Sequence, residues 1–158
     1  YVRLITSGIL PVGKELAMQN GLALNTTYRD SNGHTLDVTN LRQSTQFVAT
    51  IEITNLTGER VDNVALTQII PSGWEIVNTR FTDYDEGGDN GYIDYTDFRD
   101  DRANFYLSLK AKQTKYIKLK LNASYAGHYY LPGTYAEAMY SNRYNTRTNG
   151  KWVEVIRK

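Results

Sequence analysis

The densest run of groups that could bind a metal is acidic and lies in the middle of the chain. Residues 83–94 follow the spacing of a calcium-binding loop in part, and carboxylate oxygens are ligands that Ca²⁺ prefers. The candidate ligands are Asp83, Asp85, Asp89 and Asp94. The match is incomplete, because Gly87 occupies a ligand position and no helical pattern flanks the run. A glycine-rich, solvated loop is the favoured interpretation, and a calcium site is the alternative.

Hydrolytic chemistry would need a nucleophile beside a base, or two carboxylates across a cleft. The sequence has 2 histidines, His34 and His128. His34 follows the turn-like segment 31–33, and His128 lies between Gly127 and two tyrosines, so neither has a recognisable catalytic context. Zinc would need both histidines and an aspartate, and no spacing supports that set. The sequence therefore favours a domain that is not an enzyme and has no cofactor.

A charged run precedes one of the expected strands. It consists of Asp97, Arg99, Asp100, Asp101 and Arg102. Such a run can form a binding patch, but opposite charges this close together also pair locally at the end of a loop. We favour local pairing ahead of the strand that begins at Ala103.

Tyrosine is the other residue type that invites a binding role, because aromatic faces stack on sugar rings. The candidates for a carbohydrate surface are Tyr125, Tyr129, Tyr130 and Tyr135. The simpler interpretation is that these rings pack at the edge of the fold while their hydroxyls reach solvent or backbone, which is ordinary for tyrosine. A free-standing adhesion or carbohydrate-binding module therefore stays as the alternative function.

The composition describes one globular domain covering residues 1–158. Hydrophobic residues make up 41% and charged residues 22%, so neither disorder nor a membrane protein is indicated. The net charge is +1 with both signs interspersed, which argues against nucleic acid as a partner. No apolar run approaches the roughly 20 residues that a spanning helix needs, so we expect no membrane insertion. Without cysteine there are no disulfides, and we expect a monomer.

Alternation with a period of two is the dominant pattern. In residues 46–54, Phe47, Ala49, Ile51 and Ile53 occupy one face of a strand. In 114–123, apolar residues alternate with lysines, which predicts a solvated lysine face. The other expected strands are 22–28, 64–70, 74–79, 103–109, 135–140 and 152–156. About eight or nine short strands predict an all-β, antiparallel β-sandwich.

The remaining segments complete this expectation. Residues 11–21 are the one place for a short helix, and residues 83–101 and 141–151 are expected to be long loops. Residues 1–5 read as a strand and not as a signal peptide, so any export signal would lie upstream. We therefore expect the chain to be a module of a much longer exported protein.

The second half of the chain resembles a known family. The motifs are 95–102, then Phe-Tyr-Leu at 105–107, then Asn-Ala-Ser-Tyr-Ala-Gly-His-Tyr-Tyr-Leu-Pro-Gly-Thr-Tyr-Ala-Glu-Ala-Met-Tyr at 122–140, then 146–148 and 150–155. Pro-Ser-Gly-Trp-Glu at 71–75 is an earlier marker. The order and spacing of these motifs resemble those of the last domain of bacterial α2-macroglobulins. The resemblance runs from about residue 55 to the end.

The resemblance implies a macroglobulin-type β-sandwich that does no chemistry itself. Members of this family are large bacterial proteins of the periplasm or cell envelope, often lipid-anchored to the inner membrane. They trap proteases, in many cases through an internal thioester. The expected partners of this domain are the thioester domain and other macroglobulin domains of its parent chain, and target proteases through the parent.

The resemblance also places a role on particular residues. In the family, a Met-Tyr pair lies against the thioester and shields it from water, and here that pair is Met139 and Tyr140. Tyr144 follows in the same strip. We therefore expect Met139, Tyr140 and Tyr144 to form the interdomain, thioester-shielding site. In a parent without a thioester the same surface would be an interdomain contact.

Overall fold

The computed structural model describes residue 2, residues 11–77 and residues 93–157. The regular structure of these residues is entirely β, so this part of the chain has no helix that could cross a membrane. The strands are β1 (Met18–Asn20), β2 (Leu22–Asp30), β3 (Asn40–Arg42), β4 (Thr45–Asn55), β5 (Val61–Ile69), β6 (Trp74–Ile76), β7 (Ile93–Phe98), β8 (Arg102–Leu109), β9 (Thr114–Ala123), β10 (Gly127–Leu131), β11 (Tyr135–Ala138), β12 (Ser141–Arg147) and β13 (Lys151–Ile156).

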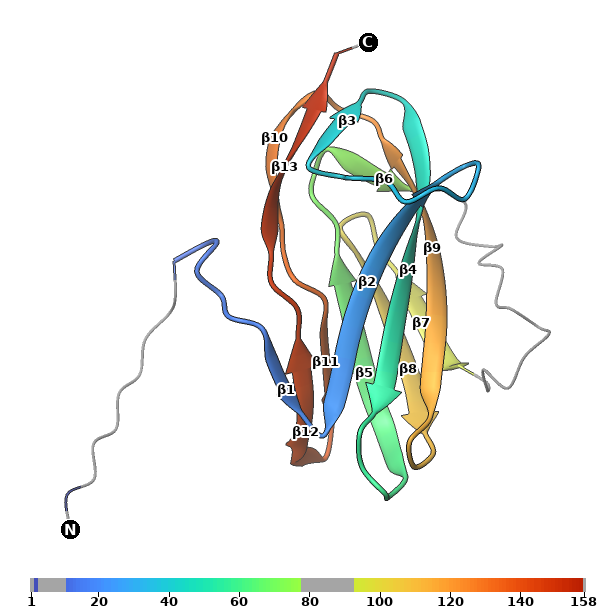
Figure 1. Cartoon of the computed structure of the whole chain (residues 1–158), viewed down its shortest axis with the longest axis vertical. Coiled ribbons are helices and arrows are strands. Elements are labelled where there is room, and N and C mark those ends of the chain that lie inside the picture. Colours follow the sequence, from blue (N-terminus) through green and yellow to red (C-terminus); the bar gives the residue numbers. More distant parts are fainter. Residues whose placement is uncertain (1, 3–10, 78–92, 158) are drawn as a thin grey trace.

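These strands form a sandwich of packed sheets (Figure 1). One layer is a six-stranded sheet in the order β1-β12-β11-β5-β8-β7, and the facing layer is a four-stranded sheet in the order β2-β4-β9-β6. A three-stranded sheet, β10-β13-β3, extends the fold at one end. Every pairing is antiparallel except that of β13 with β3, which is parallel. The expected all-β sandwich is confirmed.

The core lies between the two larger sheets and follows the alternation in the sequence. On β4, Phe47, Ala49, Ile51 and Ile53 are all buried, as predicted. The inner faces of β9 and β8 meet them from the two layers with Ile117, Leu119, Leu121, Phe105, Leu107 and Leu109. Burying each of the larger side chains stabilises the fold by about 1.5–3 kcal/mol. The regular strands β4, β8 and β9 therefore form the core to which the turns at the ends of the domain are attached.

Several expectations about the loops are wrong. The structure has 13 strands in its described residues, more than the eight or nine expected. The strands that were not expected are β1, β3, β7, β10 and β12, and two of these lie in the segments expected to be long loops. Residues 93–98 form β7, and residues 141–147 form β12. Residues 11–21 form no helix, since Gly13 and Gly21 have φ of 84° and 67°, outside the helical region. The expected strand at residues 1–5 lies almost wholly outside the described residues.

The lysine face of β9 is only partly as predicted. Lys118 and Lys120 are exposed, but Lys115 is buried because it shares the inward face with Ile117 and Leu119. Burial lowers the pKa of the Lys115 ammonium, although Asp94 acts in the opposite direction. A charged residue at the end of a strand can therefore sit on the inner face of the sheet.

Candidate interdomain site

The Met-Tyr pair singled out by the sequence is the turn between β11 and β12. Ala138 pairs with Ser141, so Met139 and Tyr140 are the two residues of the turn. The Met139 amide donates a hydrogen bond to the Asn63 carbonyl at 2.9 Å. Asn63 has a φ of 56° and lies where the pairing of β5 with β8 is irregular. A bulge in the neighbouring strand therefore fixes the backbone of the turn.

β12 bulges immediately after this turn. Glu137 pairs with Asn145 while Ala138 pairs with Ser141, so residues 142–144 have no partners on β11. The Asn145 side-chain amide donates to the Asn142 carbonyl at 3.0 Å and closes the bulge on itself. Residues 139–144 form one irregular projection, which we name the β11–β12 tip.

Tyr144 anchors the tip to the rest of the domain. Its hydroxyl donates to the Glu59 carboxylate at 3.3 Å, and the Arg143 guanidinium lies 6.0 Å from its ring centroid. The ring also packs against Gly21, where an added Cβ would lie 2.6 Å from Tyr144 Cδ1. Gly21 and Glu59 are far from Tyr144 in the sequence, so no spacing pattern could have identified them. Tyr144 is half-buried and is positioned as a support.

The tip and the β4–β5 turn enclose an open hollow of about 690 Å³. Its walls come from residues 20–21, 57–59 and 142–144. The β4–β5 turn is held by Asn55, which is fully buried and donates from its side chain to the Glu59 and Lys110 carbonyls. The Asn55 side-chain oxygen also accepts from the Thr57 amide at 2.9 Å. Both walls of the hollow are therefore tied to the sandwich.

Apolar side chains project into solvent at this end of the domain. Tyr140 is 84% exposed and Met139 is 45% exposed. Leu56, on the β4–β5 turn, is also exposed, and its amide donates to the Gly21 carbonyl. Met139 and Tyr140 are thus held on a fixed turn with their apolar surface uncovered. This arrangement suits contact with another protein surface.

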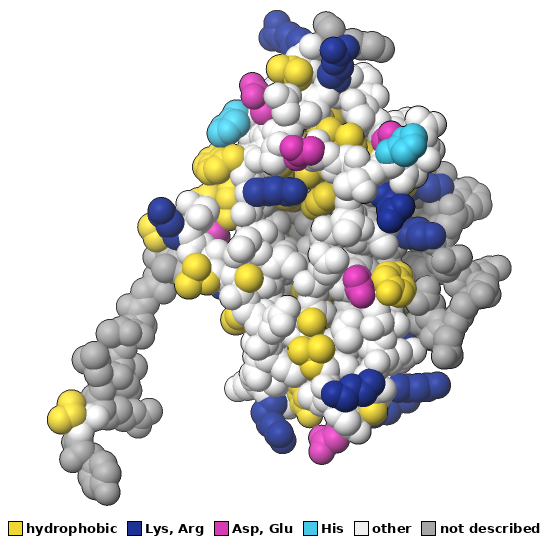
Figure 2. All heavy atoms as spheres, viewed as in Figure 1, with side chains coloured by type: hydrophobic (Ala, Val, Ile, Leu, Met, Phe, Trp, Pro, Cys, Tyr) yellow, Lys and Arg dark blue, Asp and Glu magenta, His cyan; other side chains and the backbone are white. Residues whose placement is uncertain are grey.

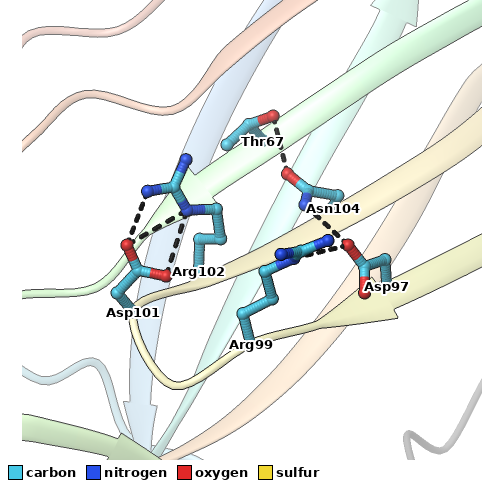
Figure 3. Close-up of polar contacts among 6 residues, drawn as sticks. All are labelled: Thr67, Asp97, Arg99, Asp101, Arg102 and Asn104. Atoms are coloured by element: carbon cyan, nitrogen blue, oxygen red, sulfur yellow. Dashed lines mark hydrogen bonds and ion pairs between the residues drawn. The ribbon is translucent and has the colours of Figure 1, made fainter.

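The charged run 97–102 pairs locally, in agreement with the favoured interpretation (Figure 3). Asp97 accepts from Arg99 at 2.9 Å, and Asp101 accepts from Arg102 at 2.6 Å. These partners hold the pKa values of the Asp97 and Asp101 carboxyls below their usual range. Asn104 links Asp97 to Thr67 across the outer face of the sheet. The run therefore spans the turn of the β7–β8 hairpin, and its charges pair within that turn.

The four candidate tyrosines do not form one carbohydrate surface. Tyr129 packs against Gly73 and donates to the Ala126 carbonyl, while Tyr130 on the opposite face of β10 donates to Glu15. Tyr125 donates to Glu75, and Tyr135 lies on β11 in a different sheet. Burial and the neighbouring Glu137 raise the pKa of Tyr135 to about 12.

The candidate metal ligands and histidines are also dispersed. Asp83, Asp85 and Asp89 lie outside the described residues, whereas Asp94 is part of β7 and accepts from Ser108. His34 lies in an exposed turn beside Asp30, and His128 stacks on Trp152. Within the described ranges 11–77 and 93–157, no three His, Asp or Glu side chains are arranged to hold a metal ion.

The model of the bacterial alpha-2-macroglobulin MG10 domain matches residues 21–142, which include β2 to β11 and the Met139–Tyr140 turn. The chain belongs to this family. It is a macroglobulin domain of the alpha-2-macroglobulin type, and the coarser part of the resemblance seen in the sequence is confirmed.

Individual relatives agree with the family assignment. An alpha-2-macroglobulin homolog of Yersinia pestis is 26% identical in an alignment of 156 positions that covers 85% of this chain and 8% of the relative. Alpha-2-macroglobulin of Pasteurella multocida is 28% identical, over 90% of this chain and 7% of the relative. The chain thus spans less than a tenth of the length of these relatives.

A solved structure has the same fold. The crystal structure of native alpha-2-macroglobulin from Escherichia coli, spanning domain MG7 to the C-terminus, matches with a TM-score of 0.80 and 17% identity. The match covers 92% of this chain and 25% of that one. At this identity the likeness concerns the fold alone.

Proposed function

We propose that this MG10 domain is the non-catalytic C-terminal domain of a bacterial alpha-2-macroglobulin-like, broad-spectrum endopeptidase inhibitor. In the parent it packs on the thioester domain and shields the thioester from water. The observation that carries this proposal is the fixed, solvent-exposed Met139–Tyr140 turn in a chain of this family. The parent is a protease trap of the bacterial periplasm or cell envelope, and it is lipid-anchored to the inner membrane.

The late position in the parent has support from two comparisons. The family model carries the number ten among macroglobulin domains, and the matching E. coli structure begins only at domain MG7. That structure is about four times as long as the part this chain covers, so other domains are available as partners. We therefore place the contact of the β11–β12 tip within the same parent molecule.

Shielding a thioester requires apolar atoms that exclude water from a hydrolysable bond and that can separate when the protease is bound. Met139 and Tyr140 supply apolar atoms, and their turn is fixed through the Asn63 carbonyl. Tyr144 acts indirectly, because its ring and its hydroxyl hold the bulge against Gly21 and Glu59. In this division of roles, the exposed pair covers the bond and Tyr144 positions the pair.

The proposal is tested in the full-length parent by thiol release with methylamine. Changing Met139→Ala together with Tyr140→Ala should accelerate release by about tenfold, which corresponds to about 1.4 kcal/mol of lost protection. Tyr116→Ala is the matched control, because Tyr116 is an exposed aromatic residue on β9. An unchanged rate in the double variant would show that the tip does not shield the thioester.

A further inference from the structure

The described residues contain two tryptophans in opposite environments. Trp74 is buried in the core, whereas Trp152 on β13 is 51% exposed on the outer face of the three-stranded sheet. The His128 ring stacks on Trp152 with centroids 4.7 Å apart and an interplanar angle of 4°. Tyr130 meets the indole edge-on at 5.3 Å. Exposed aromatic clusters of this kind are typical anchors of protein–protein contacts.

The chain enters the domain directly beside this cluster. Gly13 lies so close that an added Cβ would be 3.7 Å from Trp152 Nε1 and 3.8 Å from Tyr130 Cε2. From there the segment runs toward β1, with exposed side chains at Val12, Leu16 and Met18. Figure 2 shows hydrophobic side chains gathered along the edge where Figure 1 places β1, β10 and β13. We name Val12, Leu16, Met18, Tyr130 and Trp152 the entry patch.

Hydrogen bonds hold the entering segment against the sheets. The Tyr130 hydroxyl donates to the Glu15 carboxylate at 2.5 Å, and the Ala17 amide donates to the Asn149 side chain at 2.7 Å. The Arg147 guanidinium donates to the Leu16 carbonyl at 3.1 Å. These bonds fix the backbone while the apolar side chains stay in solvent. The patch is therefore ordered before any partner binds, which lowers the cost of binding.

We infer that the entry patch docks the domain that immediately precedes this one in the parent chain. The inference rests on the proposed position in the parent, but it concerns a different surface from the tip. A preceding domain would be tethered through the segment that carries Val12 and Leu16, so its effective concentration at the patch is high, about millimolar for a short linker. The relatives are long enough to supply it, because this chain covers only 7–8% of them.

The flanks of the patch fit an interface within one chain. Lys14 and Glu15 lie in the same segment as Val12 and Leu16, the Arg147 guanidinium donates to the Leu16 carbonyl, and Glu154 lies two residues after Trp152 on β13. These neighbouring residues carry charges of both signs, so they select neither an acidic nor a basic ligand. A continuous protein surface is the occupant that this chemistry fits.

The test uses cysteine reporters in the full-length parent and in the present chain, which has no cysteine of its own. The variants are Leu16→Cys, Tyr140→Cys and, as the matched control, Tyr116→Cys. Alkylation by iodoacetamide is followed at each site by peptide mass spectrometry. We expect Leu16→Cys to react at least about tenfold more slowly in the parent than in this chain, and Tyr116→Cys to react equally in both.

The outcomes separate this inference from the proposed function. Equal reactivity at position 16 in both contexts overturns the entry-patch inference, even when position 140 is protected. Protection at 16 without protection at 140 supports it and contradicts the shielding role. Equal slowing at positions 16 and 116 overturns it as well, because the cover would not be specific to the patch. Concentration-dependent dimerisation of this chain that Trp152→Ala abolishes would assign the patch to a second copy instead.

Discussion

The β4–β9 pair and the β11–β12 tip are opposite kinds of structure in one small domain. β4 and β9 pair without interruption from Thr45↔Ala123 to Thr54↔Thr114, and the inward residues of β4 are buried. The tip has a shifted register, unpaired residues 142–144 and a tyrosine that is 84% exposed. Regular pairing therefore supplies the stability of this domain, while irregular pairing supplies the exposed surface that we propose for contact with another domain.

The largest expected effect comes from breaking the regular region. Ile51→Ala should lower the free energy of unfolding by about 2–5 kcal/mol, because Ile51 is fully buried between the two sheets and its loss leaves a cavity. Chemical denaturation of the 158-residue chain measures this change. A loss below that range would mean that the core can collapse around the missing atoms.

Gly21, against which Tyr144 of the tip packs, should be the next most sensitive position. Gly33→Ala serves as the reference, because Gly33 also has a positive φ but nothing within 4 Å of an added Cβ. Gly33→Ala should lower the free energy of unfolding by about 1–2 kcal/mol through backbone strain alone. Gly21→Ala should cost more, because Tyr144 must also move.

A double-mutant cycle sharpens this comparison. Tyr144→Ala should remove the extra cost of Gly21→Ala and leave the strain term that Gly33→Ala also carries. In the protein that keeps Tyr144, Gly21→Ala and Gly33→Ala should differ in their loss of unfolding free energy. Equal losses would contradict the role of Tyr144 as a support.

The pH dependence of stability should reflect Tyr135 on β11, which leads into the tip. Burial and Glu137 raise its pKa to about 12 in the folded state, above the ordinary tyrosine value of about 10. The unfolded chain therefore loses this proton first, so stability should fall as the pH rises from about 10 to about 12. Tyr135→Phe should flatten that fall, and denaturation at several alkaline pH values measures it. An identical slope in both proteins would exclude Tyr135 as its source.

The smallest effect on folding should come from the exposed pair itself. Met139→Ala with Tyr140→Ala should change the free energy of unfolding by no more than about 0.5 kcal/mol per site, because both residues lie on an exposed turn outside the core. The same denaturation experiment measures it. A loss as large as that of Ile51→Ala would mean that the pair supports the fold.

The same contrast explains how much of the fold could be predicted from the sequence. β4, β8 and β9 were predicted because one face of each strand is apolar and period two shows it. β12 was missed because its residues are mostly polar and only Thr146 is fully buried, so alternation gives no signal. β7 was missed for a similar reason, since it is an edge strand with little buried surface.

The candidate site was predictable in part. A family resemblance identified Met139 and Tyr140, and the structure places both on an exposed turn. The residues that hold the tip, Gly21, Glu59 and Asn63, reach it through contacts between distant parts of the chain. A local pattern cannot reveal such contacts, because they depend on the order of strands in the sheet.

The measurement that tests the central claim most directly is thiol release with methylamine from three forms of the full-length parent. These are the intact protein, the Met139→Ala, Tyr140→Ala variant and a form that lacks this domain. We predict that deletion accelerates release and that the tip variant reproduces most of the acceleration. Acceleration on deletion alone would contradict the role of the tip, and no release from any form would mean that the parent has no thioester to shield.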